Sequence, residues 1–283
     1  MEIKDWKYYH HAAIPTVAPH KIPDLEPIKN GSIWKLDNRN VLFARYTTEF
    51  DCGYETEWFY LCRKKPFSMD ELSKSARKSI RKALTNCYVQ RINPEDYLDD
   101  MWRVYREAIE KYKHKDFVER TEEQFKSGII NRSANQEYWA AFLVENDLMI
   151  GYDGVGVYDD YVEDAVGKYS AKYMKFGASD AITFSLCEYY LSLDNIEYVC
   201  CGERSINHET NVQSYLEQRF RFEKVYCHLN IVYNPKLRII IPFLFHLRKP
   251  LCMLDSVSFI HQINSVLKME EIVRHCARGK KLE

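Results

Sequence analysis

Hydrophobic and polar positions follow two periods along the chain, one typical of strands and one typical of helices. From residue 86 to residue 235 the two kinds of segment alternate, with turn residues between them. The predicted order is a strand at 88–92, helices at 95–112 and 121–130, strands at 138–145, 148–157 and 165–174, a helix at 179–191, a strand at 196–201, a helix at 212–220 and a strand at 223–233. The acidic run at 159–164 is predicted to be an exposed connection. This order predicts an α+β protein whose mixed, largely antiparallel sheet is flanked by helices.

The two ends of the chain carry weaker patterns than its middle. Prolines recur every four residues from Pro15 to Pro27 and favour an extended N-terminal arm. Three short strands are predicted at 32–36, 41–46 and 56–62, and a mostly helical tail is predicted over 251–268 and 270–278. We therefore expect an N-terminal arm with a small sheet (1–67), a central domain (68–238) and a C-terminal helical extension (239–283).

One helix, predicted over 68–85, is strongly basic. Ser68, followed three residues later by Glu71, is the capping-box pattern that starts a helix. Apolar residues recur on one face, and the rest of the surface carries Lys74, Arg77, Lys78, Arg81 and Lys82. Three interpretations stay open for this surface: contact with the phosphates of a tRNA or a nucleotide-linked precursor, contact with an anionic membrane, or solvation alone.

Composition narrows the class of protein. The chain has 283 residues, 46% of them hydrophobic and 29% charged, which is typical of a globular protein. Its net charge of −1 excludes a generally basic nucleic-acid coat but not a local basic patch. The longest apolar run, at 239–245, is too short to cross a bilayer, and no secretory signal is recognised, so we expect a cytoplasmic protein.

Cysteine and histidine give no pattern typical of a metal site. The nine cysteines include no Cys-x-x-Cys pair and no Cys/His spacing of the zinc type, which favours a reduced protein over a disulfide framework. His10, His11 and His20 flank the proline-rich arm, where packing or turn roles are commoner than metal ligation. We therefore expect no metal.

The predicted order of elements resembles that of the GNAT acyltransferases over residues 86–235. Phe176-Gly177-Ala178-Ser179 stands where that family places Gln/Arg-x-x-Gly-x-Gly/Ala, whose backbone N–H groups hold the pyrophosphate of coenzyme A. Gly177 matches this motif, and Met174 stands in place of Gln or Arg. The resemblance implies acetyl-CoA or another acyl-CoA as cofactor, bound by Met174, Lys175, Phe176, Gly177, Ala178 and Ser179. It also implies that Gly177→Glu abolishes donor binding and leaves the fold intact.

A narrower resemblance concerns the basic helix. The run from Leu72 to Ala83, followed by Val89, resembles a basic helix of the Fem-type peptidyltransferases, which are GNAT-fold proteins that use aminoacyl-tRNA. The run from Cys201 to Ile206, with Asn211 after it, is also similar to their GNAT-like relatives. The length suffices for one full repeat and a truncated first one. The resemblance implies an aminoacyl donor, with tRNA or phosphate contact through residues 74–82.

Acyl transfer needs a site for the donor's phosphates, a stabiliser for the developing oxyanion and a base for the nucleophile. In the GNAT fold the fourth and fifth strands diverge and the acyl group enters between them. Glu203 and His208 follow the fifth strand and are candidate bases, and Tyr215 is the tyrosine nearest to the family's general acid. Candidate substrate contacts are Lys172, Tyr173, Arg204 and Asn211.

Two hypotheses of function follow. The first is an acyltransferase that moves an acyl or aminoacyl group from a phosphate-bearing donor to an amine or hydroxyl of a small molecule, sugar or cell-envelope precursor. The second is a catalytically degenerate GNAT-fold binding module. The departures at Met174 and at the general-acid tyrosine favour the second, whereas the polar cluster after the fifth strand favours the first. The sequence leaves the oligomeric state open.

Overall fold

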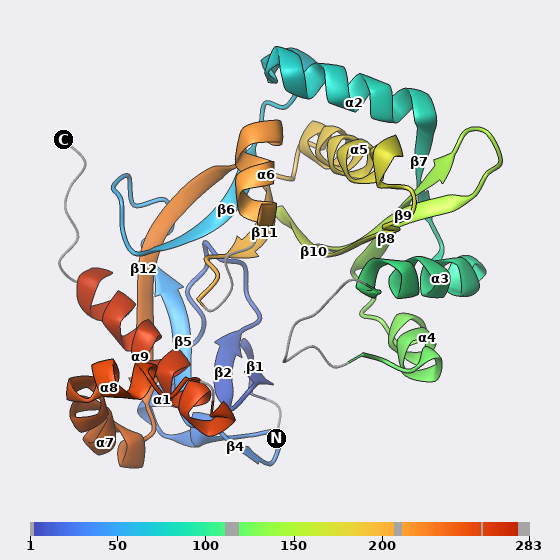
Figure 1. Ribbon diagram of the computed structural model, residues 1–283. Coiled ribbons are helices and arrows are strands. Elements are labelled where there is room, and N and C mark those ends of the chain that lie inside the picture. Colours follow the sequence, from blue (N-terminus) through green and yellow to red (C-terminus); the bar gives the residue numbers. More distant parts are fainter. Residues whose placement is uncertain (1–2, 111–118, 207–210, 256, 277–283) are drawn as a thin grey trace. The chain divides into compact units, whose positions relative to one another are not determined.

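The computed structural model describes residues 3–110, 119–206, 211–255 and 257–276, and the chain forms two compact units (Figure 1). Unit 1 comprises residues 1–60, 203–210 and 224–283, and unit 2 comprises residues 61–202 and 211–223. The chain passes between the units four times: within strand β6 (Trp58–Lys64), near the end of strand β11 (Tyr198–Glu203), between residues 210 and 211, and between residues 223 and 224. The limits of the two units differ from those of the three segments expected from the sequence. The division into three segments stays a prediction.

The strands of unit 2 lie side by side in one sheet. Neighbouring strands follow the order β11, β10 (Tyr161–Tyr169), β9 (Met149–Val157), β8 (Gln136–Leu143) and β7 (Cys87–Ile92), with β7 at the edge. The strands β7 to β10 pair antiparallel, and β11 pairs parallel to β10. The prediction of a mixed, largely antiparallel sheet is therefore confirmed.

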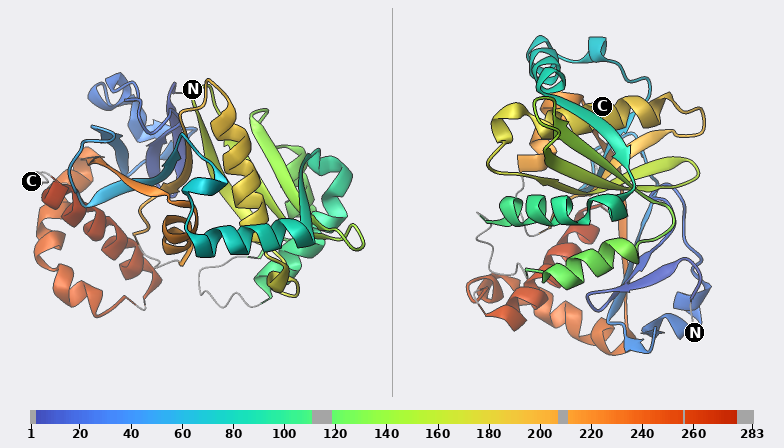
Figure 2. Two further views of the ribbon diagram at one scale, coloured as in Figure 1. Left: turned by 90° about the horizontal axis from the view of Figure 1, so that it is seen from above. Right: turned by 90° about the vertical axis from the view of Figure 1, so that its right-hand side faces the viewer.

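Helices cover both faces of this sheet (Figures 1 and 2). The helices of unit 2 are α2 (Lys74–Asn86), α3 (Leu98–Ile109), α4 (Glu122–Ile130), α5 (Ala178–Ser192) and α6 (Asn211–Phe220), with short 3-10 turns at η2 (Met69–Glu71), η3 (Pro94–Tyr97) and η4 (Met174–Phe176). On one face, α2, α5 and α6 bury a core that includes Ile80, Ile182 and Leu216. On the other face, α3 and α4 bury a second core around Met101 and Phe125.

The basic helix begins later than predicted. Glu71 does accept a hydrogen bond from the Ser68 N–H (3.2 Å), but this cap starts only the turn η2. Helix α2 starts after Ser73, whose hydroxyl accepts from the Ala76 N–H at 3.2 Å. Its amphipathic pattern is as predicted, because Ala76, Ile80 and Ala83 are buried.

Strands β10 and β11 pair over three residues only, from Tyr161 beside Tyr198 to Glu163 beside Cys200. Directly after the last pair, the register of β10 against β9 shifts between Asp164 and Val166. A bulge of this kind bends a strand and increases its twist, so β10 diverges from β11 from this point. The expected divergence of the fourth and fifth strands is therefore present.

The limits predicted for β10 were wrong. The acidic connection 159–164 was expected to be exposed, but its last four residues belong to the strand, and Val162 is fully buried. The strand ends at Tyr169, so residues 170–173 form a turn and not the alternating strand end that was predicted.

Unit 1 contains strands and helices of its own. Its strands are β1 (Trp6–Tyr9), β2 (Ala12–Pro15), β5 (Phe43–Thr48), β12 (Glu223–Tyr233) and the small pair β3 (Lys35–Leu36) and β4 (Arg39–Asn40). Its helices are α1 (Glu26–Lys29), α7 (Pro235–His246), α8 (Arg248–Cys252) and α9 (Ser258–Cys276), with a 3-10 turn at η1 (Ser32–Trp34). β2 lies parallel to β5, and β5 pairs antiparallel with β12.

Helix α9 covers this sheet, because its Met269 and Ile272 pack with Phe43 and Trp58. Within the predicted helical extension 239–283, the pattern gave helices at 251–268 and 270–278 but no separate helix for α7, which contains the apolar run at 239–245 and an internal proline, Pro242. No helix in the described part of the chain combines the length and the apolarity that a membrane span requires.

Candidate functional site

The start of helix α5 lies directly after the diverging strand β10. The turn η4 ends in Gly177, whose φ of +81° is the left-handed conformation that favours glycine. The first intrahelical bond runs from the Ala181 N–H to the Gly177 carbonyl. The N–H groups of Ala178, Ser179 and Asp180 therefore have no partner within the helix, as at any helix N-terminus, and can donate to an anion.

Gly177 is required by packing as well as by backbone conformation. A Cβ atom at this position would lie 2.9 Å from the Cβ of Ala83 on α2. A glutamate at Gly177 would therefore clash with α2 and adopt a strained φ. The expectation that Gly177→Glu leaves the fold intact was wrong, and a test of this site needs another residue.

A carboxylate lies in the first turn of α5. Asp180 is 9% exposed, and its Oδ1 accepts a hydrogen bond from the Tyr215 hydroxyl at 2.6 Å. Arg219 on α6 places its Nε 3.6 Å from the same oxygen. Burial and the charge of Asp180 raise the pKa of Tyr215, so this tyrosine keeps its proton. In this geometry Tyr215 joins α6 to the start of α5 and is a weak proton donor.

A second buried acid lies in the sheet, under α5. Asp153 on β9 is 2% exposed, and its Oδ2 accepts from the Tyr169 hydroxyl at 2.9 Å. Two glycines make room for the Tyr169 ring: a Cβ at Gly151 would lie 2.8 Å from its Cδ1, and one at Gly167 would lie 2.9 Å from its hydroxyl. β9 and β10 each have a glycine where a larger residue would clash with the Tyr169 side chain.

Asp153 and Asp164 form an acid pair. Burial, and then the negative charge of Asp164, raise the pKa of Asp153 well above its usual value. Burial also raises the pKa of Asp164. Asp153 Oδ1 has no hydrogen-bond partner among the described residues. Because burial disfavours the charged form of both groups, the pair binds a proton more readily than an isolated carboxyl group does.

The turn after β10 holds two residues that were predicted to contact substrate. Lys172 is exposed, and its Nζ lies 3.1 Å from Glu107 Oε1 on α3. Tyr173 is half-buried and its ring lies beside that of Phe176. Met174 and Lys175 are exposed, and the Lys175 ammonium lies 5.0 Å from the centre of the Phe176 ring.

Other predicted site residues lie elsewhere. Glu203 belongs to unit 1, where Arg45 forms an ion pair with it. Arg204 places Nη1 2.7 Å from Glu57 Oε2, also within unit 1. Asn211 is the exposed first residue of α6, and His208 lies outside the described residues. The structure thus brings together Ser179 and Tyr215, and separately gives Glu203 and Arg204 partners of opposite charge.

The sequence pattern did not point to three carboxyl groups of this region, the buried Asp153 and Asp180 and the half-buried Asp164. Asp153 carried a usable signal, because it is the one charged residue in the otherwise apolar segment Met149–Val157. Asp164 carried none, because it ends an acidic run that is typical of an exposed loop. Asp180 follows the glycine motif, where an acid in a first helical turn is common whatever the function.

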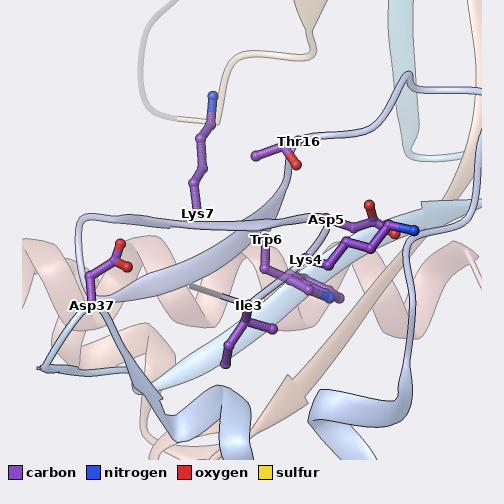
Figure 3. A pocket seen from close by; sticks show the side chains of 7 residues that line it. All are labelled: Ile3, Lys4, Asp5, Trp6, Lys7, Thr16 and Asp37. Atoms are coloured by element: carbon purple, nitrogen blue, oxygen red, sulfur yellow. The ribbon is translucent and has the colours of Figure 1, made fainter. Parts of the chain in front are cut away.

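A cavity of about 700 Å³ lies in unit 1, at the N-terminal arm (Figure 3). Its lining residues are Ile3, Lys4, Asp5, Trp6, Lys7, Thr16 and Asp37. None of these is a predicted site residue. Over the described ranges, no three His, Cys, Asp or Glu side chains gather closely enough to hold a metal ion.

No protein-family profile and no curated protein matches the sequence. Among solved structures, FemX is similar with a TM-score of 0.53 and 9% identity, over 78% of this chain and 81% of that one. The C-terminal domain of a putative lysylphosphatidylglycerol synthetase from Agrobacterium fabrum has a TM-score of 0.50 and 10% identity, over 82% and 80%. A conserved protein of unknown function from Bacteroides thetaiotaomicron also has a TM-score of 0.50 and 10% identity, over 81% and 83%.

The fold of this chain is GNAT-like and is similar to that of FemX and of the synthetase domain. At 9 and 10% identity the likeness concerns the fold and not the chemistry. It reaches beyond residues 86–235, the region in which the sequence resembled GNAT proteins, because it covers 78 to 82% of the chain.

Proposed function

We propose that the chain is an acyltransferase that binds a phosphate-bearing donor at the start of α5 and its acyl group where β10 leaves β11. The observation that carries this proposal is the combination of these two features: β11 pairs with β10 only as far as Glu163, and α5 begins at Ala178, soon after β10 ends. Residues 174–179 would contact the phosphates of the donor. The acyl group would lie in the gap between the diverging strands β10 and β11.

The residues at the start of α5 fit an anion such as a pyrophosphate. Ala178 and Ser179 offer backbone N–H groups, and Lys175 adds an exposed cation one turn earlier. The negative charge of Asp180 opposes an anion, but Arg219 lies 3.6 Å from it and offsets that charge. A bound acyl-CoA would supply an activated thioester, and the same contacts suit any other phosphate-bearing acyl carrier.

The acceptor must lose a proton when it attacks the acyl group. The Asp153–Asp164 pair, with its raised pKa values, is suited to take that proton through the Tyr169 hydroxyl, because a carboxylate is a better base when its pKa lies closer to neutrality. Glu203 and His208 are the other candidate bases, and Arg204 and Asn211 the candidate acceptor contacts. Tyr215 positions Asp180 in this proposal.

The acceptor we propose is an amine or hydroxyl of a small molecule, a sugar or a cell-envelope precursor. Phosphates on this acceptor, or on an aminoacyl-tRNA donor, would bind the outer face of α2. Lys74, Lys78, Arg81 and Lys82 are exposed there, and none has an ion-pair partner in the described part of the chain. Binding of this kind weakens steeply as salt rises.

The donor site is tested with Ser179→Glu. A glutamate in the first turn suits the helix dipole, so the fold should hold, but its charge would repel a phosphate. We expect acetyl-CoA, or charged tRNA, to raise the melting temperature of the unaltered protein and not that of this variant. Ser133→Glu, which adds the same charge at an exposed position of unit 2, is the matched control. Equal shifts in all three proteins would refute the donor site.

One observation favours the second hypothesis, a GNAT-fold binding module without catalysis. The Tyr215 hydroxyl donates a hydrogen bond to Asp180, and the pKa of Tyr215 is raised. The residue nearest to the family's general acid is therefore poorly suited to protonate a leaving group. Donor binding without release of free thiol from an acyl-CoA, over a panel of amine and hydroxyl acceptors, would support this alternative.

A further inference from the structure

Helix α7 in unit 1 is apolar on the side that packs against the protein and also on the opposite side. Ile241 is 4% exposed and faces the protein. On the other side, Ile239 and Phe243 keep 70% and 72% of their surface exposed, and Leu247 follows one turn later at 53%. A helix that is hydrophobic all round is typical of a place where apolar material covers both sides.

The segment after α7 exposes further large apolar side chains. Met253, Leu254 and Val257 are 85%, 52% and 49% exposed. Helices α7 and α8 contact each other and both contact α9, and Figures 1 and 2 show them on the outer side of α9 within unit 1. Exposed apolar groups collected on one part of a protein are typical of an interaction or membrane surface.

The charges in this segment have one sign. From Lys224 to Leu254 the sequence contains no aspartate and no glutamate. Lys236, Arg238 and Lys249 are exposed and have no ion-pair partner among the residues that the structure describes. Unpaired cations beside exposed apolar side chains are complementary to an anionic lipid surface, where phosphates lie next to acyl chains.

Helix α9 holds these helices in place. The Asn264 side chain is 2% exposed, and its Nδ2 donates to the Leu251 carbonyl at 3.1 Å and to Asp255 Oδ1 at 2.7 Å. Arg248 differs from Lys236, Arg238 and Lys249, because its Nε lies 3.4 Å from Glu271 Oε1 on α9. These contacts fix α8 on α9, and α7 packs against both helices through its other side, where Ile241 is buried, so its exposed apolar side chains need no unfolding to reach a partner.

We propose that α7 and α8 dock on an anionic lipid bilayer, with α7 lying in the plane of the interface. The twelve residues of α7 are about 18 Å long, which is well below the roughly 30 Å of the hydrocarbon core, so the helix lies on the bilayer. Ile239 and Phe243 enter among the acyl chains, and Lys236, Arg238 and Lys249 reach the headgroup phosphates. This docking is independent of the proposed acyl transfer.

The test is co-sedimentation of the full chain with lipid vesicles. Vesicles of phosphatidylcholine with phosphatidylglycerol should bind the protein, and vesicles of phosphatidylcholine alone should bind it much less. Ile239→Ser with Phe243→Ser should lower the partition coefficient more than tenfold, because both apolar anchors are lost. Ile130→Ser, at an exposed apolar position of α4 in unit 2, is the matched control and should bind like the unaltered protein.

A second set of variants tests the charges. Serine at Lys236, Arg238 and Lys249 should weaken binding about fivefold per residue, and added salt should remove the difference. The same exchange at Lys78 and Arg81 on α2 should have little effect. Loss of vesicle binding through α2 alone would overturn the proposal. A second outcome would also overturn it: the unaltered protein binds no vesicle and is a dimer, and the α7 variant is a monomer. The apolar side of α7 would then be covered by a second copy of the chain.

Discussion

The two faces of the sheet in unit 2 are built differently, although the same strands form both. The face under α3 and α4 is packed with Met101, Val104 and Phe125 against Tyr152, which is the ordinary construction of a core. The face under α5 contains apolar residues too, but it also buries Asp153 and the Tyr169 hydroxyl that donates to it. Buried carboxyl groups destabilise a fold unless they are paired and protonated.

This difference indicates which face has a function beyond stability. Successive side chains of a strand point to opposite faces of the sheet, so a polar residue on one face does not weaken the packing of the other face. Gly151 and Gly167 add a further cost to the α5 side, because glycine weakens a strand. Such destabilising features on one face only are typical of a site, and α5, which covers this face, is the helix that follows β10, the strand that leaves β11. Four variants test this comparison.

The largest effect is expected on the α3 face. Met101 is fully buried among apolar side chains, so Met101→Ala should lower the free energy of unfolding by about 3 kcal/mol through lost burial and a cavity. The core around Met101 contains no carboxyl group, so the loss of unfolding free energy should be the same at pH 5 and pH 8. Urea unfolding at the two pH values measures it, and a loss that changed with pH would contradict the comparison.

On the α5 face, Gly151→Ala should lower the free energy of unfolding by about 2 kcal/mol. The added Cβ would lie 2.8 Å from Tyr169 Cδ1 and 3.2 Å from Ala178 Cβ, so an aromatic ring and the start of α5 must both shift. The variant combined with Tyr169→Ala should recover part of the loss, because the ring is then absent. No recovery in the double variant would show that the ring is not the obstacle.

The sequence predicted the order of elements well, because that order depends on local periodicity. It did not predict the site to the same degree, because the site depends on contacts between distant residues. The partners of Glu203 and Arg204 are Arg45 and Glu57, which are 158 and 147 residues away. Which side chains gather under α5 depends on one shift of register in β10, and no local pattern marks that shift.

Asp153→Asn should change how stability depends on pH. Asp153 has a raised pKa, so the folded protein holds a proton that the unfolded chain releases above pH about 4. The free energy of unfolding should therefore fall as pH rises through this window, by up to about 1.4 kcal/mol per pH unit. Asparagine cannot titrate, and its amide oxygen still accepts from Tyr169, so the fall should be smaller in the variant. Denaturant titrations between pH 4 and pH 8 measure it, and an equal slope would place the titration elsewhere.

The smallest effect is expected at Glu107, on the α3 side of the turn that contains Lys172. Burial alone would raise the pKa of Glu107, but hydrogen bonds from Ser170 and Lys172 and the charge of Arg103 lower it below its usual value. The ionised form is thus favoured by folding, and its contribution is present above the unfolded pKa of about 4.3 and lost as pH falls through the lower folded pKa. Glu107→Gln should lower the free energy of unfolding by about 1 kcal/mol at pH 7, and this difference should vanish in acid. Glu145→Gln, at an exposed carboxylate, is the control and should change little at either pH. If Glu107→Gln lowered the free energy of unfolding equally in acid, the loss would come from packing. The ion pair between Glu107 and Lys172 would then contribute nothing to the stability of the turn.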